Sequence, residues 1–76
     1  MFLSDNELAR IRRMYPEGTR VELVSMNDAQ APPIGTRGTV KVVDDIGTVF
    51  CSWDNGSGLG FAPGEDVVRM VVDDND

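Results

Sequence analysis

The first apolar pattern along the chain has the spacing of a helix. Its apolar stripe repeats at three- and four-residue intervals and consists of Leu8, Ile11 and Tyr15. Ser4 and Glu7 have the spacing of a capping box, in which each side chain accepts a hydrogen bond from an amide of the first turn. Pro16 follows the stripe, and proline cannot continue a helix because it lacks an amide hydrogen. The pattern predicts one N-terminal helix, over about residues 4–15.

From Thr19 onward the apolar period changes to two, which is the period of a β-strand. In the first strand, Val21 and Leu23 are predicted to face the core. A long loop with little periodicity, residues 26–34, separates this strand from the next. Four further strands are predicted, and they cover about residues 38–44, 48–53, 57–61 and 66–72.

Alternation also predicts which side chains share a face in the later strands. In the second strand, Val40 and Val42 alternate with Thr39 and Lys41, so both valines are predicted on the same face. The other same-face sets are Val49, Cys51 and Trp53 in the third strand and Leu59 and Phe61 in the fourth. Of these, Trp53 is expected to line the core.

Four Gly-Thr pairs punctuate the chain, and their glycines are Gly18, Gly35, Gly38 and Gly47. Glycine accepts the positive φ of tight turns, and threonine favours the extended chain that follows. Each pair is therefore predicted to join a turn to a strand, and one turn before the second strand accounts for both Gly35 and Gly38. The segment Asp54-Asn55-Gly56 predicts a type I′ hairpin, which needs positive φ at both central residues.

One helix, five short strands, a long first loop and three tight connections are typical of an SH3-like barrel. The OB-fold is the competing five-stranded arrangement, but it places a helix between its third and fourth strands, where Asp54-Asn55-Gly56 leaves no room. We therefore expect a mainly β fold, a small five-stranded SH3-like barrel with one N-terminal α-helix. Residues 1–72 are expected to form a single domain, and residues 73–76 a disordered acidic tail.

The charge balance narrows the classes of partner. Thirteen acidic residues oppose seven basic ones, for a net charge of −6. Nucleic-acid binding relies on cationic side chains that release counterions from phosphates, so a nucleic-acid partner is disfavoured. The single cysteine, Cys51, excludes an intramolecular disulfide and agrees with a cytoplasmic location. Neither a membrane span, which needs about 20 apolar residues, nor a secretory signal is expected.

Candidate catalytic chemistry is sparse. The chain has no histidine, the commonest general base near neutral pH. Cys51 shares a strand face with apolar side chains, which favours a buried structural thiol over a nucleophile. Asp44 and Asp45 could serve as paired carboxylates, although adjacent acids are also ordinary in a solvated hairpin. We expect no enzyme activity, no cofactor and no metal site.

Arg37 has the weakest structural reason for its position, because it follows a long, irregular loop. Its guanidinium could pair with a phosphate or a carboxylate. The residues that we assign to an anionic-ligand site are Arg37, Thr36, Arg20, Lys41, Arg69, Trp53 and Phe61. An aromatic groove for a proline-rich peptide is an alternative use of the two aromatic side chains together with Tyr15, but residues 26–34 lack the aromatics typical of such barrels.

Four motifs together resemble one family of small proteins. They are YPEGTRVEL at residues 15–23, PPIGTRGTV at 32–40, DDIGT at 44–48 and WDNGS at 53–57. The family carries a domain of unknown function and occurs in bacteriophages and mobile elements of Gram-positive bacteria. The resemblance covers about residues 15–70 and implies no catalytic residues.

The resemblance also implies a context for function. Small acidic phage proteins often bind and block a host component, which places this chain in the host cytosol. One form of that role is a homo-oligomer that sequesters an anionic nucleotide signal of host defence, with arginines converging on the phosphates. The alternative is an adaptor or inhibitor that docks on a host or phage protein through the barrel loops.

Overall fold

A computed structural model describes residues 3–72 of the chain. The helix α1 spans Asp5–Met14 and confirms the predicted helix, including its capping box. The Ser4 Oγ accepts from the Glu7 amide at 3.1 Å, and the Glu7 Oε1 accepts from the Ser4 amide at 3.1 Å. At the other end, Tyr15 caps the helix through its amide, which donates to the Ile11 carbonyl at 2.9 Å. The predicted disordered tail lies outside the described residues.

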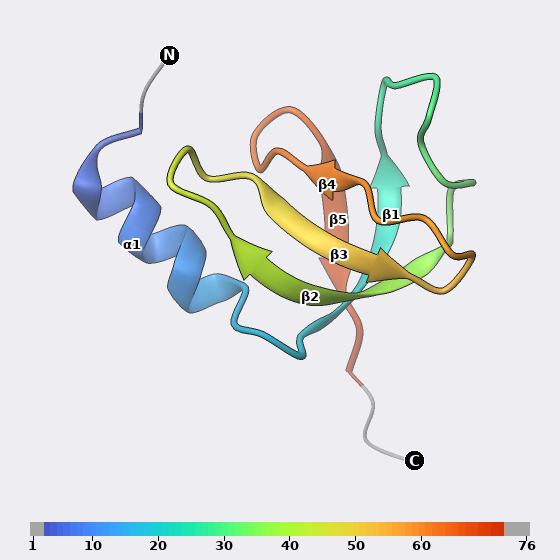
Figure 1. Cartoon of the computed structure of the whole chain (residues 1–76), viewed down its shortest axis with the longest axis horizontal. Helices are drawn as coiled ribbons and strands as arrows, with labels where there is room; N and C mark the ends of the chain where they lie inside the picture. The colour runs from blue at the N-terminus through green and yellow to red at the C-terminus, as the bar shows by residue number, and fades with distance from the viewer. Residues whose placement is uncertain (1–2, 73–76) are drawn as a thin grey trace.

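Five antiparallel strands form one curled sheet beside the helix (Figure 1). They are β1 Arg20–Ser25, β2 Arg37–Val43, β3 Val49–Trp53, β4 Gly60–Phe61 and β5 Val67–Met70. The strand order is β4-β3-β2-β1-β5, so the first strand pairs with both the second and the last. This arrangement confirms the mainly β, SH3-like fold with one N-terminal helix.

The fourth strand is shorter than predicted. Only Gly60 and Phe61 pair with β3. Residues 57–59 belong to the connection that follows the hairpin turn, in which the Ser57 carbonyl accepts from the Trp53 amide. The Leu59 carbonyl accepts from the Trp53 indole nitrogen at 2.7 Å, and the Leu59 amide donates to the Ser57 hydroxyl at 3.2 Å. Those side-chain bonds replace the ladder bonds that a longer strand would make.

Two hairpins of the same geometry join β2 to β3 and β3 to β4. In the second, the Gly56 amide donates to the Trp53 carbonyl at 2.9 Å, and the Trp53 amide donates to the Ser57 carbonyl at 2.9 Å. Gly56 has a φ of +95°, but no described residue other than glycine has a positive φ. The predicted type I′ turn is therefore wrong, because Asn55 would need a positive φ. The hydrogen bonds fit a three-residue loop that ends in a left-handed glycine.

The Gly-Thr pairs do not all form turns. Gly18 and Gly35 both have a φ of +92°, and each is followed by a threonine whose amide closes a four-residue turn. Gly38 lies inside β2 without a positive φ, opposite Trp53 of β3. The prediction that one turn accounts for both Gly35 and Gly38 is wrong, because β2 begins at Arg37, before the second glycine.

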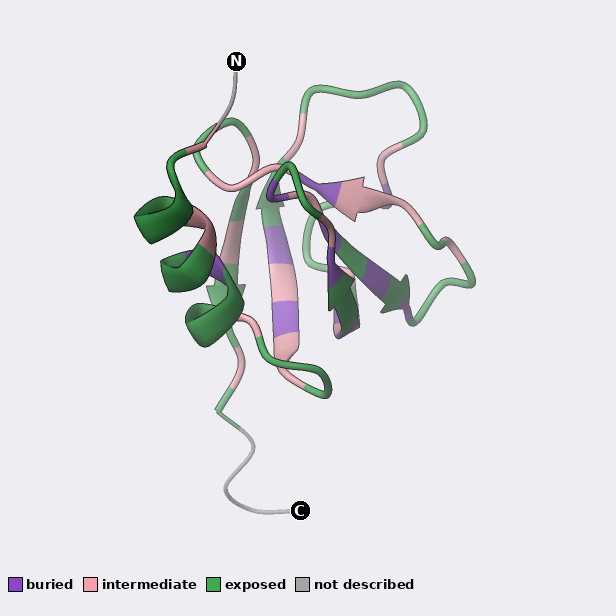
Figure 2. Ribbon diagram, turned by 60° about the vertical axis from the view of Figure 1, so that its left-hand side comes forward, coloured by how far each residue is buried: buried purple, intermediate pink, exposed green. Residues whose placement is uncertain are grey.

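The core lies between the concave face of the sheet and the inner side of α1 (Figure 2). Its buried members are Ile11, Val21, Leu23, Val40, Val43, Val49, Cys51, Trp53 and Phe61. Leu8 and Tyr15 of the predicted helix stripe pack against this cluster. The helix therefore packs on its own barrel, and the predicted inward faces of the first and third strands are confirmed.

One inward residue is misassigned by simple alternation. The register of β2 against β3 shifts between Val40 and Val42, so Lys41 is the extra residue of a β-bulge. After the bulge the faces exchange: Val42 is 56% exposed and Val43 only 8%. The prediction that Val42 shares the face of Val40 is wrong, because a bulge breaks the two-residue period.

Candidate functional site

Three of the predicted arginines lie close together on the outer face of β5, β1 and β2, but each already holds a carboxylate. Glu22 stands opposite both Arg37 and Arg69 in the sheet register. It accepts from Arg37 Nε at 3.2 Å and from Arg69 Nη2 at 2.9 Å. These bonds, that from Arg69 first, hold the pKa of Glu22 below its usual value.

Arg20 completes this outer face through a two-pronged ion pair. Its Nη1 and Nη2 each donate to Asp54 at 2.8 Å, and Nη1 also donates to the Thr39 hydroxyl at 3.1 Å. The hydrogen bonds from Arg20 lower the pKa of Asp54. We call this surface the arginine face, and it consists of Arg20, Glu22, Arg37, Asp54 and Arg69. An anionic ligand there would compete with the two resident carboxylates.

Two other residues assigned to the anionic site lie apart from this network. Lys41 is exposed at the β2 bulge, farther along the strand from Arg37. Thr36 is half-buried at the turn before β2, where its carbonyl accepts from the Leu23 amide at 2.9 Å. Neither side chain takes part in the ion pairs of the arginine face.

The two aromatic residues assigned to the anionic-ligand site are in the core, which corrects that assignment. Trp53 is 2% exposed and Phe61 is 1% exposed. The Trp53 indole is held by its bond to the Leu59 carbonyl, and the Phe61 ring meets Tyr15 edge-on, with centroids 5.3 Å apart. Because strand alternation points both rings inward, neither offers an open face to a base.

The candidate catalytic side chains are either buried in the core or already engaged by other residues of the chain. Cys51 is buried, and burial raises the pKa of its thiol to about 11, so the thiol is protonated near neutral pH. Asp44 accepts from the Ile46 and Thr48 amides at 3.1 and 2.8 Å, whereas Asp45 pairs with Arg12 at 3.0 Å. The two carboxylates therefore have different partners. Within residues 3–72, no group of three or more His, Cys, Asp or Glu side chains could hold a metal ion.

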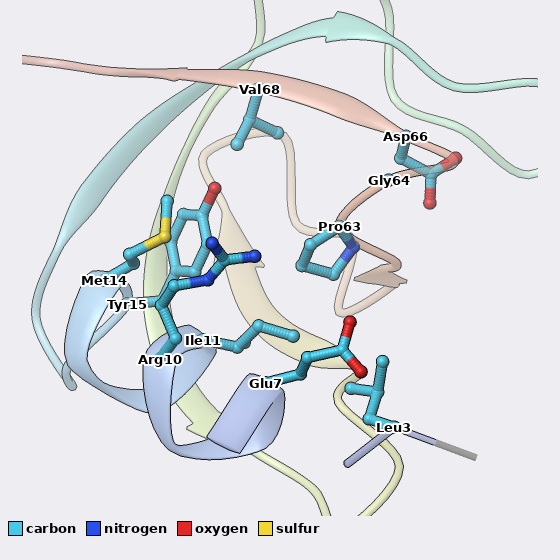
Figure 3. A pocket seen from close by; sticks show the side chains of 10 residues that line it. All are labelled: Leu3, Glu7, Arg10, Ile11, Met14, Tyr15, Pro63, Gly64, Asp66 and Val68. Atoms are coloured by element: carbon cyan, nitrogen blue, oxygen red, sulfur yellow. The ribbon is translucent and has the colours of Figure 1, made fainter. Parts of the chain in front are cut away.

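A groove between α1 and the β4–β5 connection is the site that sequence reasoning missed (Figure 3). We call it the helix groove, and it has a volume of about 380 Å³. It is lined by Leu3, Glu7, Arg10, Ile11, Met14, Tyr15, Pro63, Gly64, Asp66 and Val68. A neighbouring hollow of about 480 Å³ shares Leu3, Ile11, Pro63 and Gly64 with it and extends to Ile46 at the tip of the β2–β3 hairpin.

The groove combines apolar walls with polar groups of fixed position. The walls are formed by Ile11 and Met14 from α1 and by Val68 from β5. Glu7 is oriented by its bonds with Ser4, which also lower the pKa of its carboxyl. Asp66 is oriented because its Oδ2 accepts from the Ala62 amide at 2.7 Å. Arg10 is the third charged group of the lining.

The helix wall of the groove could be predicted from the sequence, whereas the opposite wall could not. The helical stripe correctly indicated that Ile11 and Tyr15 face the barrel. The opposite wall, at Pro63 and Val68, is far away in sequence and meets the helix only through the folding of the sheet. Gly47 lines the neighbouring hollow, where the ends of the Leu3 and Ile11 side chains pack against it and a Cβ atom would force Leu3 to shift.

Fold and site together define a small SH3-like β domain with an N-terminal helix, a mixed apolar and charged groove and a self-paired arginine face. Residues 4–71 match the family described as a domain of unknown function, DUF4314, and the chain belongs to that family. Neither the curated proteins nor the solved structures compared with the chain contain a match. The one helix among the described residues is too short to cross a membrane.

Proposed function

We propose that this protein is a non-enzymatic binding module that holds a segment of a partner protein in the helix groove. The observation that carries this proposal is the composition of the groove, in which apolar walls meet oriented carboxylates. Ligand sites in proteins have volumes of about 300–1,000 Å³ and mostly apolar linings with a few placed polar groups. The helix groove, at about 380 Å³, fits that description.

The identity of the partner rests on the family context. The resemblance to phage and mobile-element proteins suggests that the partner is a host component, which binding would block. Phage origin, a cytosolic location and self-association stay predictions of the sequence.

The test is a selection of displayed random short peptides on the purified protein, followed by affinity measurements with two variants. Met14→Arg places a charge in the groove at a side chain that is 48% exposed, so the fold should survive. Val42→Arg is the matched control, because Val42 is exposed on the sheet and does not line the groove. We expect peptides that bind the wild type and the control but lose binding to Met14→Arg. Absence of such peptides would contradict the proposal.

Sequestration of an anionic nucleotide is a second candidate, favoured by the clustering of Arg20, Arg37 and Arg69 on one face. Guanidinium groups pair with phosphate in the same two-pronged way as with carboxylate. A phosphate could therefore take the place of the Glu22 carboxylate between Arg37 and Arg69. With Trp53 and Phe61 buried, the base would need other contacts.

Thermal unfolding with a panel of cyclic and linear nucleotides tests this candidate, because a ligand that binds the folded state raises Tm. Glu22→Gln should increase the Tm shift by removing the competing charge, and Arg37→Ala should abolish it. Lys41→Ala is the control, since Lys41 lies outside the arginine face. No Tm shift at low salt for either the wild type or Glu22→Gln would exclude the candidate.

A further inference from the structure

We infer that the helix groove is specific for a partner segment that combines a large apolar side chain with a neighbouring basic side chain. This inference rests on the proposed function and adds the chemistry of the partner. It depends on the apolar walls of the groove, on the positions of its three charged groups and on the charge of the whole chain.

The apolar half of the site lies at the C-terminal end of α1. Met14 is nearly half exposed although it is apolar, and it lies beside Tyr15 in the groove lining. Methionine is unbranched and adapts its shape to a partner, which suits a binding surface. Burial of a leucine-sized or larger side chain against these walls would supply the main part of the affinity.

The charged half of the site has two carboxylates in fixed positions. Glu7 and Asp66 each use one carboxylate oxygen to accept from a backbone amide, Ser4 and Ala62 respectively. The second oxygen of each carboxylate, Oε2 of Glu7 and Oδ1 of Asp66, accepts no hydrogen bond from the described residues. A carboxylate that is already oriented loses little freedom when it binds a lysine or arginine, so it favours a cationic partner.

The positive and negative side chains of the groove lie on different sides of it. Figure 3 shows the Arg10 guanidinium on the Tyr15 side of the groove and the Glu7 and Asp66 carboxylates on the Pro63 side. Glu65 lines the adjoining hollow on that same connection and adds a further acid. A basic side chain of the partner would therefore lie toward Pro63 and an apolar one toward Met14.

The net charge of −6 supports the same partner at longer range. It attracts a cationic segment and accelerates its association. It opposes a second copy of this chain as the occupant, because two copies of equal charge repel. A basic–apolar segment is thus the occupant that agrees with both the local and the overall charge.

The test uses the peptides selected on the wild type whose binding is lost in Met14→Arg. We expect these peptides to be enriched in a lysine or arginine beside a large apolar residue. Their affinity should fall roughly threefold to thirtyfold in the double variant Glu7→Gln/Asp66→Asn, as expected from two exposed ion pairs. Both substitutions keep an oxygen acceptor for the amides of Ser4 and Ala62, so the groove should keep its shape.

The matched control is Glu17→Gln/Asp28→Asn, which changes the net charge equally at residues outside the groove lining. It should leave the affinity within about twofold at moderate salt, because neither side chain lines the groove and salt screens exposed charges. Added salt should weaken wild-type binding more than binding to the Glu7→Gln/Asp66→Asn variant, which lacks the two local carboxylates but keeps most of the net negative charge.

The outcomes separate this inference from the proposed function. Groove-dependent peptides without basic residues, or equal affinities for the two double variants, would overturn the inference and leave the binding function intact. Absence of groove-dependent peptides would overturn both. A concentration-dependent dimer that Met14→Arg dissociates would identify a second copy as the occupant and overturn the inference.

Discussion

Gly38 of β2 lies directly against the indole of Trp53, its cross-strand partner in β3. A Cβ atom at position 38 would lie 2.7 Å from Trp53 Cε3. The indole has little room to move, because its nitrogen donates to the Leu59 carbonyl at 2.7 Å. The glycine therefore makes space for the largest side chain of the core.

Gly38→Ala should destabilise the protein by about 1–3 kcal/mol, the usual cost of an overpacked core. Urea unfolding followed by the fluorescence of Trp53, the single tryptophan, measures the change. Gly58→Ala is the control, because a Cβ there meets nothing within 4 Å, and its effect should stay within about 0.5 kcal/mol. Equal stabilities for the two variants would show that the indole moves aside freely.

The β-bulge at Lys41 predicts very different stability losses when each of two adjacent valines is replaced by threonine. Val43→Thr should cost about 1–3 kcal/mol, because it buries a hydroxyl in the core. Val42→Thr should change stability by less than about 0.5 kcal/mol, because Val42 is exposed. Chemical denaturation of both variants checks this, and the reverse order would mean that the bulge is absent in solution.

Glu22 should make the stability depend on pH. Its pKa is lowered by hydrogen bonds from Arg69 and Arg37, so its stabilising contribution is present above the usual pKa of 4.5 and is lost as pH falls through the lowered value. Glu22→Gln should therefore be less stable than the wild type at pH 7, and the difference should shrink below about pH 4.5.

Thermal unfolding across this pH range, at low and high salt, measures the contribution of Glu22. Glu17→Gln is the control, since Glu17 is exposed and none of the ion pairs between described residues includes it. A stability difference between wild type and Glu22→Gln that does not change with pH would contradict the ion-pair assignment.

Cys51 should react with thiol reagents only when the protein unfolds. Burial raises the pKa of its thiol from 9.0 to about 11, so the native thiol is both protonated and shielded at pH 8. Above pH 9 the unfolded chain ionises first, so stability should fall as pH rises from about 9 to 11. Labelling with a disulfide reagent, with and without denaturant, measures the first effect, and labelling at equal rates would contradict the burial of Cys51.

Features formed by residues close together in the sequence were predicted better than contacts between residues far apart. The helix and its capping box were predicted correctly because Ser4 and Glu7 interact across three residues. Among the residues assigned to a ligand site, Arg20 and Arg69 were correctly placed on strands, whereas Arg37 was predicted in the turn before the second strand and begins β2 instead. The carboxylate partners of the three arginines were not foreseen. Arg69 meets Glu22 across 47 residues of sequence, and no local pattern signals that pairing.

The sequence by itself determined much of the local structure of this protein: where the helix begins, the turns at Gly18 and Gly35, and the apolar faces of the first and third strands. Each depends on backbone preferences and on hydrogen bonds between residues a few positions apart. Only the tertiary structure decided the bulge that exchanges Val42 and Val43, the pairing of the arginines with Glu22 and Asp54, and the groove between α1 and Pro63. These depend on the register of paired strands and on the packing of the helix against a distant connection, which no short segment specifies alone.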